Sequence, residues 1–141
     1  MKLLLTTLFV VMLQNLSGQD SIRLTRQYEN DRPVTRLDSF FYQVPNTIFI
    51  SLDEGFNDSL HVSINDTIIL RQYFITNESI GYAGGLNISF KDSSEVKILK
   101  LLFIKANKYI LEKVNLNYKS LQIRGLKPWL LIYGNRFYMR V

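Results

Sequence analysis

The stretch LHVSINDTIILRQYF, residues 60–74, decides the fold. Its first five residues alternate apolar and polar side chains, which is typical of a half-buried β-strand. The next two residues, Asn65 and Asp66, readily adopt the left-handed backbone angles of a tight turn. Residues 67–74 then return with many β-branched and aromatic side chains. This pattern predicts a β-hairpin, the clearest one in the chain.

Similar short strands, separated by turn signals, extend outward from this hairpin. Gly134-Asn135 near the C-terminus is a favoured two-residue hairpin pair. About eight or nine short strands are typical of a two-sheet sandwich. The sequence therefore predicts an all-β fold, an antiparallel β-sandwich with an immunoglobulin-like outline, over residues 47–141. The expected strands are 47–52, 60–64, 67–74, 86–90, 96–104, 109–116, 119–124, 129–133 and 136–141.

Residues 92–116 admit two interpretations. Asp92 and Glu95 have the spacing of a helical capping box, and apolar residues recur on one helical face. However, further apolar residues such as Leu111 would lie on the opposite face, which a surface helix leaves polar. Asn107 also interrupts the middle of the segment. Two strands joined by a turn at Ala106-Asn107 are favoured, and the helix remains the alternative.

Residues 1–18 have the three-part layout of a secretory signal peptide. A positive start is followed by the apolar run Leu3–Leu13 and by a small, polar exit. A membrane-spanning anchor would need about 18 or more apolar residues, so this run is too short to be one. We expect cleavage after Gly18 and an exported product, periplasmic, cell-surface or secreted, with no transmembrane span in the mature chain.

Residues 19–46 are interpreted as a polar leader that precedes the domain. This segment carries four arginines and is punctuated by Pro33 and Pro45. Phe40-Phe41-Tyr42 is expected to fix it to the domain, whereas Gln19 to Pro33 is expected to be mobile.

Composition excludes several classes of site. The chain has no cysteine, so disulfides, thiol catalysis, zinc–thiolate sites and lipid attachment at a cysteine are excluded. Its formal net charge is +5, and the basic residues gather from Lys91 onward. A basic C-terminal region of this kind can favour binding to lipid headgroups or other acidic partners. The lysines are dispersed, however, which is more typical of a solvated face, and we expect no nucleic-acid partner.

One loop suggests a metal site. Asp53, Glu54, Asn57 and Asp58 supply four oxygen-bearing side chains within six residues. Calcium prefers six to eight oxygen ligands, so this speculative calcium set is incomplete. An ordinary solvated loop is the simpler interpretation, and we expect no cofactor.

Aromatic residues suggest a second kind of site. Trp129, Tyr133 and Tyr138 are close together on the expected C-terminal hairpin. Flat aromatic rings stack against the apolar faces of sugars, so these three residues form a speculative sugar-binding platform. Aromatic side chains also fill the cores of β-sandwiches, and this interpretation competes with the first.

Catalytic patterns are weak. The glutamates fall in separate segments, and nothing in the sequence pairs two carboxylates for glycoside hydrolysis. His61, the single histidine, falls on the polar side of its strand. We therefore expect that the protein is not an enzyme.

Several short motifs recur along the chain. They are the Asp-Ser/Thr-aliphatic triplets Asp20-Ser21-Ile22, Asp58-Ser59-Leu60 and Asp66-Thr67-Ile68, the stretch 58–70, the loop before Gly81 and the tyrosine-rich C-terminal hairpin. Together with Gln19 after the expected cleavage point, these motifs resemble those of small exported β-domain proteins of Bacteroidota, in which such triplets are O-glycosylation acceptors. The resemblance covers residues 47–141 and implies fold and compartment rather than activity.

These observations predict an exported, non-enzymatic binding or structural accessory domain of the cell envelope. Its partner would be a protein or another envelope component, contacted by strand addition or through a sheet face. The first alternative is a carbohydrate-binding module that uses the exposed aromatic residues of the C-terminal hairpin. The second alternative is a small hydrolase.

Overall fold

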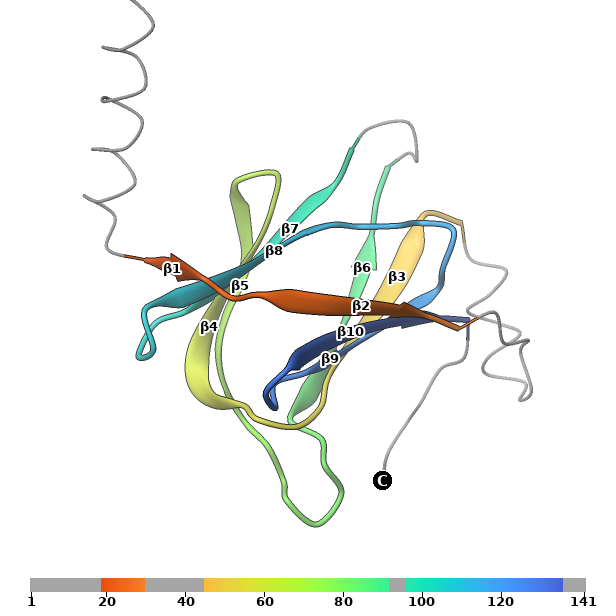
Figure 1. Cartoon of the computed structure of the whole chain (residues 1–141). Coiled ribbons are helices and arrows are strands. Elements are labelled where there is room, and N and C mark those ends of the chain that lie inside the picture. Colours follow the sequence, from red (N-terminus) through yellow and green to blue (C-terminus); the bar gives the residue numbers. More distant parts are fainter. Residues whose placement is uncertain (1–18, 30–44, 92–95, 136–141) are drawn as a thin grey trace, which may run out of the picture.

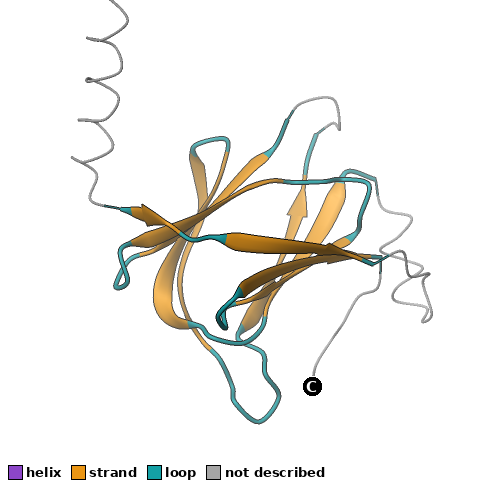
Figure 2. Ribbon diagram, in the orientation of Figure 1, coloured by secondary structure: helices purple, strands orange, loops and turns teal. Residues whose placement is uncertain are grey.

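The computed structural model describes residues 19–29, 45–91 and 96–135, and the regular structure in these ranges is entirely β-strand (Figure 1, Figure 2). Within these ranges no helix has the length and apolar character needed to cross a membrane. The strands are β1 (Asp20–Ser21), β2 (Leu24–Tyr28), β3 (Thr47–Leu52), β4 (Asn57–Ile64), β5 (Thr67–Ile75), β6 (Gly84–Ser89), β7 (Ile98–Phe103), β8 (Lys108–Lys113), β9 (Ser120–Arg124) and β10 (Trp129–Gly134).

These strands form two five-stranded sheets. The first sheet has the order β1-β8-β7-β4-β5, and the second has the order β2-β10-β9-β3-β6. Apolar side chains from both sheets pack into one buried cluster. Its fully buried members include Leu60 and Leu101 of the first sheet and Ile50 and Leu131 of the second. The predicted all-β class is confirmed, and the two packed sheets are consistent with a β-sandwich.

The prediction of antiparallel sheets is wrong for three strand pairs. β1 runs parallel to β8, β2 to β10 and β3 to β9, so both sheets are mixed. Antiparallel neighbours can be joined by a short hairpin turn, which leaves a signal in the sequence. These parallel partners are separated by long stretches of chain, so no turn residue indicates their direction.

The predicted hairpin of residues 60–74 is confirmed. β4 and β5 pair antiparallel, and the turn residues have positive φ angles, 47° at Asn65 and 68° at Asp66. The Asn65 side chain also accepts a hydrogen bond from the backbone N–H of Ile98 (2.8 Å). The turn is therefore tied to the start of β7, the other neighbour of β4.

The segment 92–116 forms two strands where the structure describes it. β7 and β8 pair antiparallel, and Asn107 between them has a positive φ of 53°. The helical alternative is therefore wrong from Val96 onward, and residues 92–95 lie outside the described part. Short side chains such as Asn tolerate the left-handed region, which explains why this residue marks a turn.

The sheets include strands that precede the predicted domain start at Thr47. β1 joins β8 in the first sheet and β2 joins β10 in the second, with only Ile22 and Arg23 between them. The N-terminal segment thus crosses from one sheet to the other (Figure 1). The remainder of the predicted leader (30–44), the predicted signal peptide (1–18) and the predicted last strand (136–141) lie outside the described residues.

Candidate functional site: a pocket at the strand crossover

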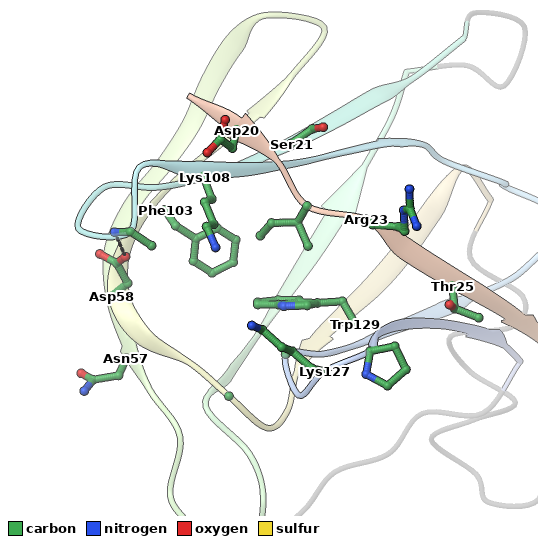
Figure 3. A pocket seen from close by; sticks show the side chains of 15 residues that line it. Asp20, Ser21, Arg23, Thr25, Asn57, Asp58, Phe103, Lys108, Lys127 and Trp129 are labelled. Atoms are coloured by element: carbon green, nitrogen blue, oxygen red, sulfur yellow. Dashed lines mark hydrogen bonds between the residues drawn. The ribbon is translucent and has the colours of Figure 1, made fainter. Parts of the chain in front are cut away.

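A pocket of about 810 Å³ lies where the N-terminal segment crosses between the sheets (Figure 3). The crossover residues 20–23 and Thr25 line it, together with the start of β4, the turn between β7 and β8, and the loop before β10. Four segments that are distant in the sequence therefore meet around one hollow.

The wall of this pocket includes the ring of Trp129. The Trp129 ring meets the ring of Phe103 edge-on, with centroids 5.4 Å apart, and the ring of Phe56 in the same manner at 5.9 Å. It also lies against Gly125, where an added Cβ would come within 2.8 Å of the indole. These contacts fix the ring of the half-buried Trp129 beside the pocket.

Three cationic side chains surround this aromatic wall. Arg23 comes from the crossover, Lys108 from β8 and Lys127 from the loop before β10 (Figure 3). None of the three forms an ion pair with a described residue. Asp20 lines the same pocket as a carboxylate from β1. The cations outnumber it, which favours an anionic occupant.

Asp58, the second carboxylate of the pocket lining, is already engaged. Its two side-chain oxygens accept hydrogen bonds from the backbone N–H groups of Lys105 (2.8 Å) and Ala106 (2.9 Å). Asp58 is 6% exposed. It therefore holds the turn between β7 and β8 in place, and with it the adjacent side chain of Lys108.

A different polar cluster links the two sheets further along β10. Arg26 of β2 donates bonds to both carboxylate oxygens of Glu112 in β8, at 2.9–3.1 Å. The hydroxyl of Tyr133 donates to the same carboxylate at 3.0 Å. The bond to Glu112 raises the pKa of the Arg26 guanidinium, partly offset by burial. Burial raises the pKa of the Tyr133 phenol, and the charge of Glu112 raises it further.

Comparisons of the chain with models of protein families, with curated proteins and with solved structures found no match. The site must therefore be interpreted from its own geometry.

The predicted sugar platform is not assembled as expected. Tyr133 is 1% exposed and stacks on Tyr28 with ring centroids 5.4 Å apart, whereas Trp129 borders the crossover pocket. Four residues along one strand separate them by about 13 Å, so a single sugar ring cannot stack on both. Tyr138 lies outside the described residues. Of the three predicted aromatic residues, Trp129 lines the crossover pocket, whereas Tyr133 lines a different hollow beside Arg26 and Glu112.

The four residues of the predicted calcium loop also have separate roles. The buried carboxylate of Asp53 accepts a hydrogen bond from the hydroxyl of Ser51, and the side chain of Asn57 accepts one from Tyr73. The backbone oxygen of Glu54 accepts a bond from Gly125 N–H (2.6 Å). In the described ranges no group of three or more His, Asp or Glu side chains gathers as a metal site. Together with the engaged Asp58, these contacts do not supply a calcium cage.

The pocket residues that sequence reasoning missed include Phe103 and the three cations Arg23, Lys108 and Lys127. The sequence places Arg23 in the leader and Phe103 in a strand that turns at Ala106-Asn107, so neither is predicted to meet Trp129. The position of Lys127, two residues before Trp129, was the only local signal that a cation accompanies the indole. Lys108 lies beside these residues because Asp58 binds the turn between β7 and β8. No sequence pattern indicates this contact between Asp58 and the turn.

Proposed function

We propose that this protein is a non-enzymatic binding domain that holds an anionic ligand in the crossover pocket. One observation carries the proposal: a fixed tryptophan wall surrounded by three cations that form no ion pair with a described residue. Lys and Arg bind carboxylates and phosphates through charge-assisted hydrogen bonds, while an indole face takes an apolar surface. The favoured ligand is an anionic molecule with one apolar face.

An acidic sugar is the second candidate, and it narrows the carbohydrate hypothesis. The C–H face of a sugar ring fits the Trp129 indole, and a uronic acid carboxylate would find Arg23, Lys108 or Lys127 nearby. A neutral sugar would offer no negative charge to these three cations. The carbohydrate site that we propose therefore consists of Trp129 and the three cations. It replaces the set of Trp129, Tyr133 and Tyr138 that the sequence suggested.

The pocket favours binding over hydrolysis. A glycosidase needs two carboxylates that are free to act as acid and as base or nucleophile. Asp58 uses both of its oxygens to bind turn N–H groups, which leaves Asp20 as the carboxylate without such bonds in the lining. This arrangement supports a non-enzymatic domain, with a small hydrolase as the less favoured hypothesis.

We further propose export to the cell envelope, where the domain serves as an accessory to a protein or another envelope component. The layout of residues 1–18 supports a cleaved signal peptide. The domain also keeps an immunoglobulin-like outline in this proposal, supported by its two packed sheets. Its parallel pairs, such as β3 with β9, depart from the antiparallel sheets of that fold.

Intrinsic fluorescence provides the test, because Trp129 is the only tryptophan in the chain. Titration with an oligogalacturonate is expected to shift the emission of Trp129, whereas a neutral galactose oligomer of equal length is expected to leave it unchanged. The double variant Lys108→Gln/Lys127→Gln is expected to weaken binding at least about tenfold, since charge-assisted bonds are lost. Arg71→Gln/Lys100→Gln is the matched control on another surface.

The outcomes separate the two candidates. Binding of a carboxylate-bearing aromatic compound without binding of the oligogalacturonate supports the anionic-ligand proposal and removes the sugar. If no anionic compound changes the Trp129 emission, or if both double variants lose affinity equally, the pocket is not the binding site.

A further inference from the structure

The outer face of the first sheet exposes an unusual number of large apolar side chains. Five of them are between 44% and 58% exposed. They lie on or next to strands β5, β7 and β8. Four of them adjoin a buried residue and therefore point away from the core, and Ile69 lies where the register between β4 and β5 shifts. Large apolar patches on a protein surface commonly mark interaction sites. These residues are Ile69, Tyr73, Ile75, Ile104 and Leu111.

Cations are interspersed among these apolar residues. Arg71 lies across from His61, Lys100 across from Leu111, and Lys113 across from Ile98. The Lys100 ammonium lies 5.1 Å from the centroid of the Tyr109 ring on the same face. Charged and apolar side chains are therefore mixed across four neighbouring strands rather than separated into two patches.

Acidic residues are absent from this face over the same four strands. β4, β5, β7 and β8 contain two carboxylates in all, Asp58 and Glu112. Both are buried on the inner side, where one binds turn N–H groups and the other binds Arg26. The charge that faces outward on these strands is therefore entirely positive.

We propose that this face, defined by Ile69, Arg71, Tyr73, Lys100, Leu111 and Lys113, docks onto an anionic lipid surface. Such a surface supplies negative headgroups for the three cations and an interfacial layer that accepts aliphatic side chains. Tyrosine is itself enriched at that layer, and lysine stems lie along apolar material while their charge stays in water. The surface is separate from the crossover pocket, and the inference does not rest on the proposed ligand.

Strand addition at the edge of this sheet fits less well. β5 is an edge strand, but its pairing with β4 contains a bulge between Val62 and Ser63. Bulges are one of the devices by which edge strands avoid pairing with another chain. The face of the sheet is therefore favoured over its edge as the contact surface.

Vesicle co-sedimentation of the full chain tests this inference. The full chain is expected to bind vesicles of phosphatidylglycerol and phosphatidylcholine, and to bind pure phosphatidylcholine vesicles far more weakly. The face variant is Arg71→Gln/Lys100→Gln/Lys113→Gln. Its affinity for the anionic vesicles is expected to fall by about tenfold to a hundredfold, because each basic residue at such a surface contributes about fivefold.

A matched control removes the same charge from a different place. Arg23→Gln/Lys108→Gln/Lys127→Gln changes three cations of the crossover pocket, and it is expected to reduce vesicle binding by less than about threefold. Residues 1–18 are identical in every variant, so their contribution to binding cancels. A third variant, Ile69→Ser/Leu111→Ser, keeps all cations and is expected to weaken binding as well, because apolar contact is lost.

Three results would overturn the proposal. These are equal losses in the face and pocket variants, no preference for anionic vesicles, and binding to a soluble acidic polypeptide with no binding to vesicles. The last result would identify an acidic protein as the partner of this face. Urea midpoints of each variant verify that the compared proteins are folded.

Discussion

The outer faces of the two sheets differ, although the strands of both alternate between core and outer side chains. On the second sheet, Ile132, Gln122 and Ser51 form one cross-strand row, and each is at most 7% exposed. On the first sheet, the row of Arg71, His61 and Leu102 is exposed or half-buried. Alternation thus shows which side chains leave the core, but it does not show whether they reach water.

Because of this difference, substitutions on the two outer faces should affect different properties, folding stability in one case and binding in the other. The outward side chains of β10, β9 and β3 in this row of the second sheet are buried, so replacing one of them should alter the free energy of unfolding. The exposed outward side chains of the first sheet, such as Arg71 and Leu111, are accessible, so their replacement should alter binding and leave stability nearly unchanged.

The largest expected change in stability comes from replacing an outward aliphatic residue, and it is expected on the second sheet but not on the first. Ile132→Ala is expected to lower the free energy of unfolding by about 3 kcal/mol, because Ile132 is 5% exposed and its loss leaves a cavity. Leu111→Ala, at a position that is 49% exposed, is expected to change it by less than about 0.5 kcal/mol. Urea denaturation measures both values. Equal effects would show that the two faces do not differ in this way.

The strand pattern in the sequence predicted most of the first sheet. The hairpin at Asn65-Asp66 and the turn at Asn107 can be recognised from the local sequence, because both use residues that tolerate positive φ. The four strands β4, β5, β7 and β8 are joined through these local turns or pair antiparallel with a neighbour. Their apolar alternation was therefore sufficient to identify the strands.

Prediction failed where strands that are distant in the sequence meet. The segment containing Leu24 appeared to be a polar leader because β2 exposes most of its residues, yet it pairs with β10 along its full length. An edge strand with polar residues has the composition of a loop, and its parallel partner leaves no turn signal. The crossover pocket depends on this pairing, so Arg23 and Lys108 could not be assigned to one site from the sequence.

The next prediction compares two buried carboxylates, one associated with each sheet. Asp58→Asn in the first sheet is expected to lower the free energy of unfolding by about 1–3 kcal/mol. The reason is that an amide NH2 cannot accept the backbone bond that a carboxylate oxygen accepts there. Asp53, after β3 of the second sheet, accepts a bond from Ser51 through one oxygen, while its other oxygen is buried and has no hydrogen-bond partner among the described residues.

Asp53→Asn is therefore expected to change stability by less than about 0.5 kcal/mol or to increase it, because an unpaired buried charge is removed. Both variants are compared by urea denaturation at neutral pH. A larger loss for Asp53→Asn than for Asp58→Asn would contradict the roles assigned to these two carboxylates.

The smallest effect concerns Tyr133, which joins the second sheet to Glu112 of the first. Because the pKa of Tyr133 is raised in the folded state, the folded protein keeps a proton that the unfolded chain releases above about pH 10. Its contribution to stability is therefore fully present below about pH 10 and declines as the pH rises further. Tyr133→Phe is expected to cost about 1–2 kcal/mol at neutral pH, because the bond to Glu112 is lost.

Above about pH 10, the stability difference between the unmodified chain and Tyr133→Phe is expected to shrink by up to about 1.4 kcal/mol per pH unit. Urea denaturation at a series of alkaline pH values measures this slope. Burial is the larger cause of the raised pKa, so the slope should persist when both proteins also carry Glu112→Gln. If Glu112→Gln abolished this slope, the charge of Glu112 rather than burial would be the main cause of the raised Tyr133 pKa.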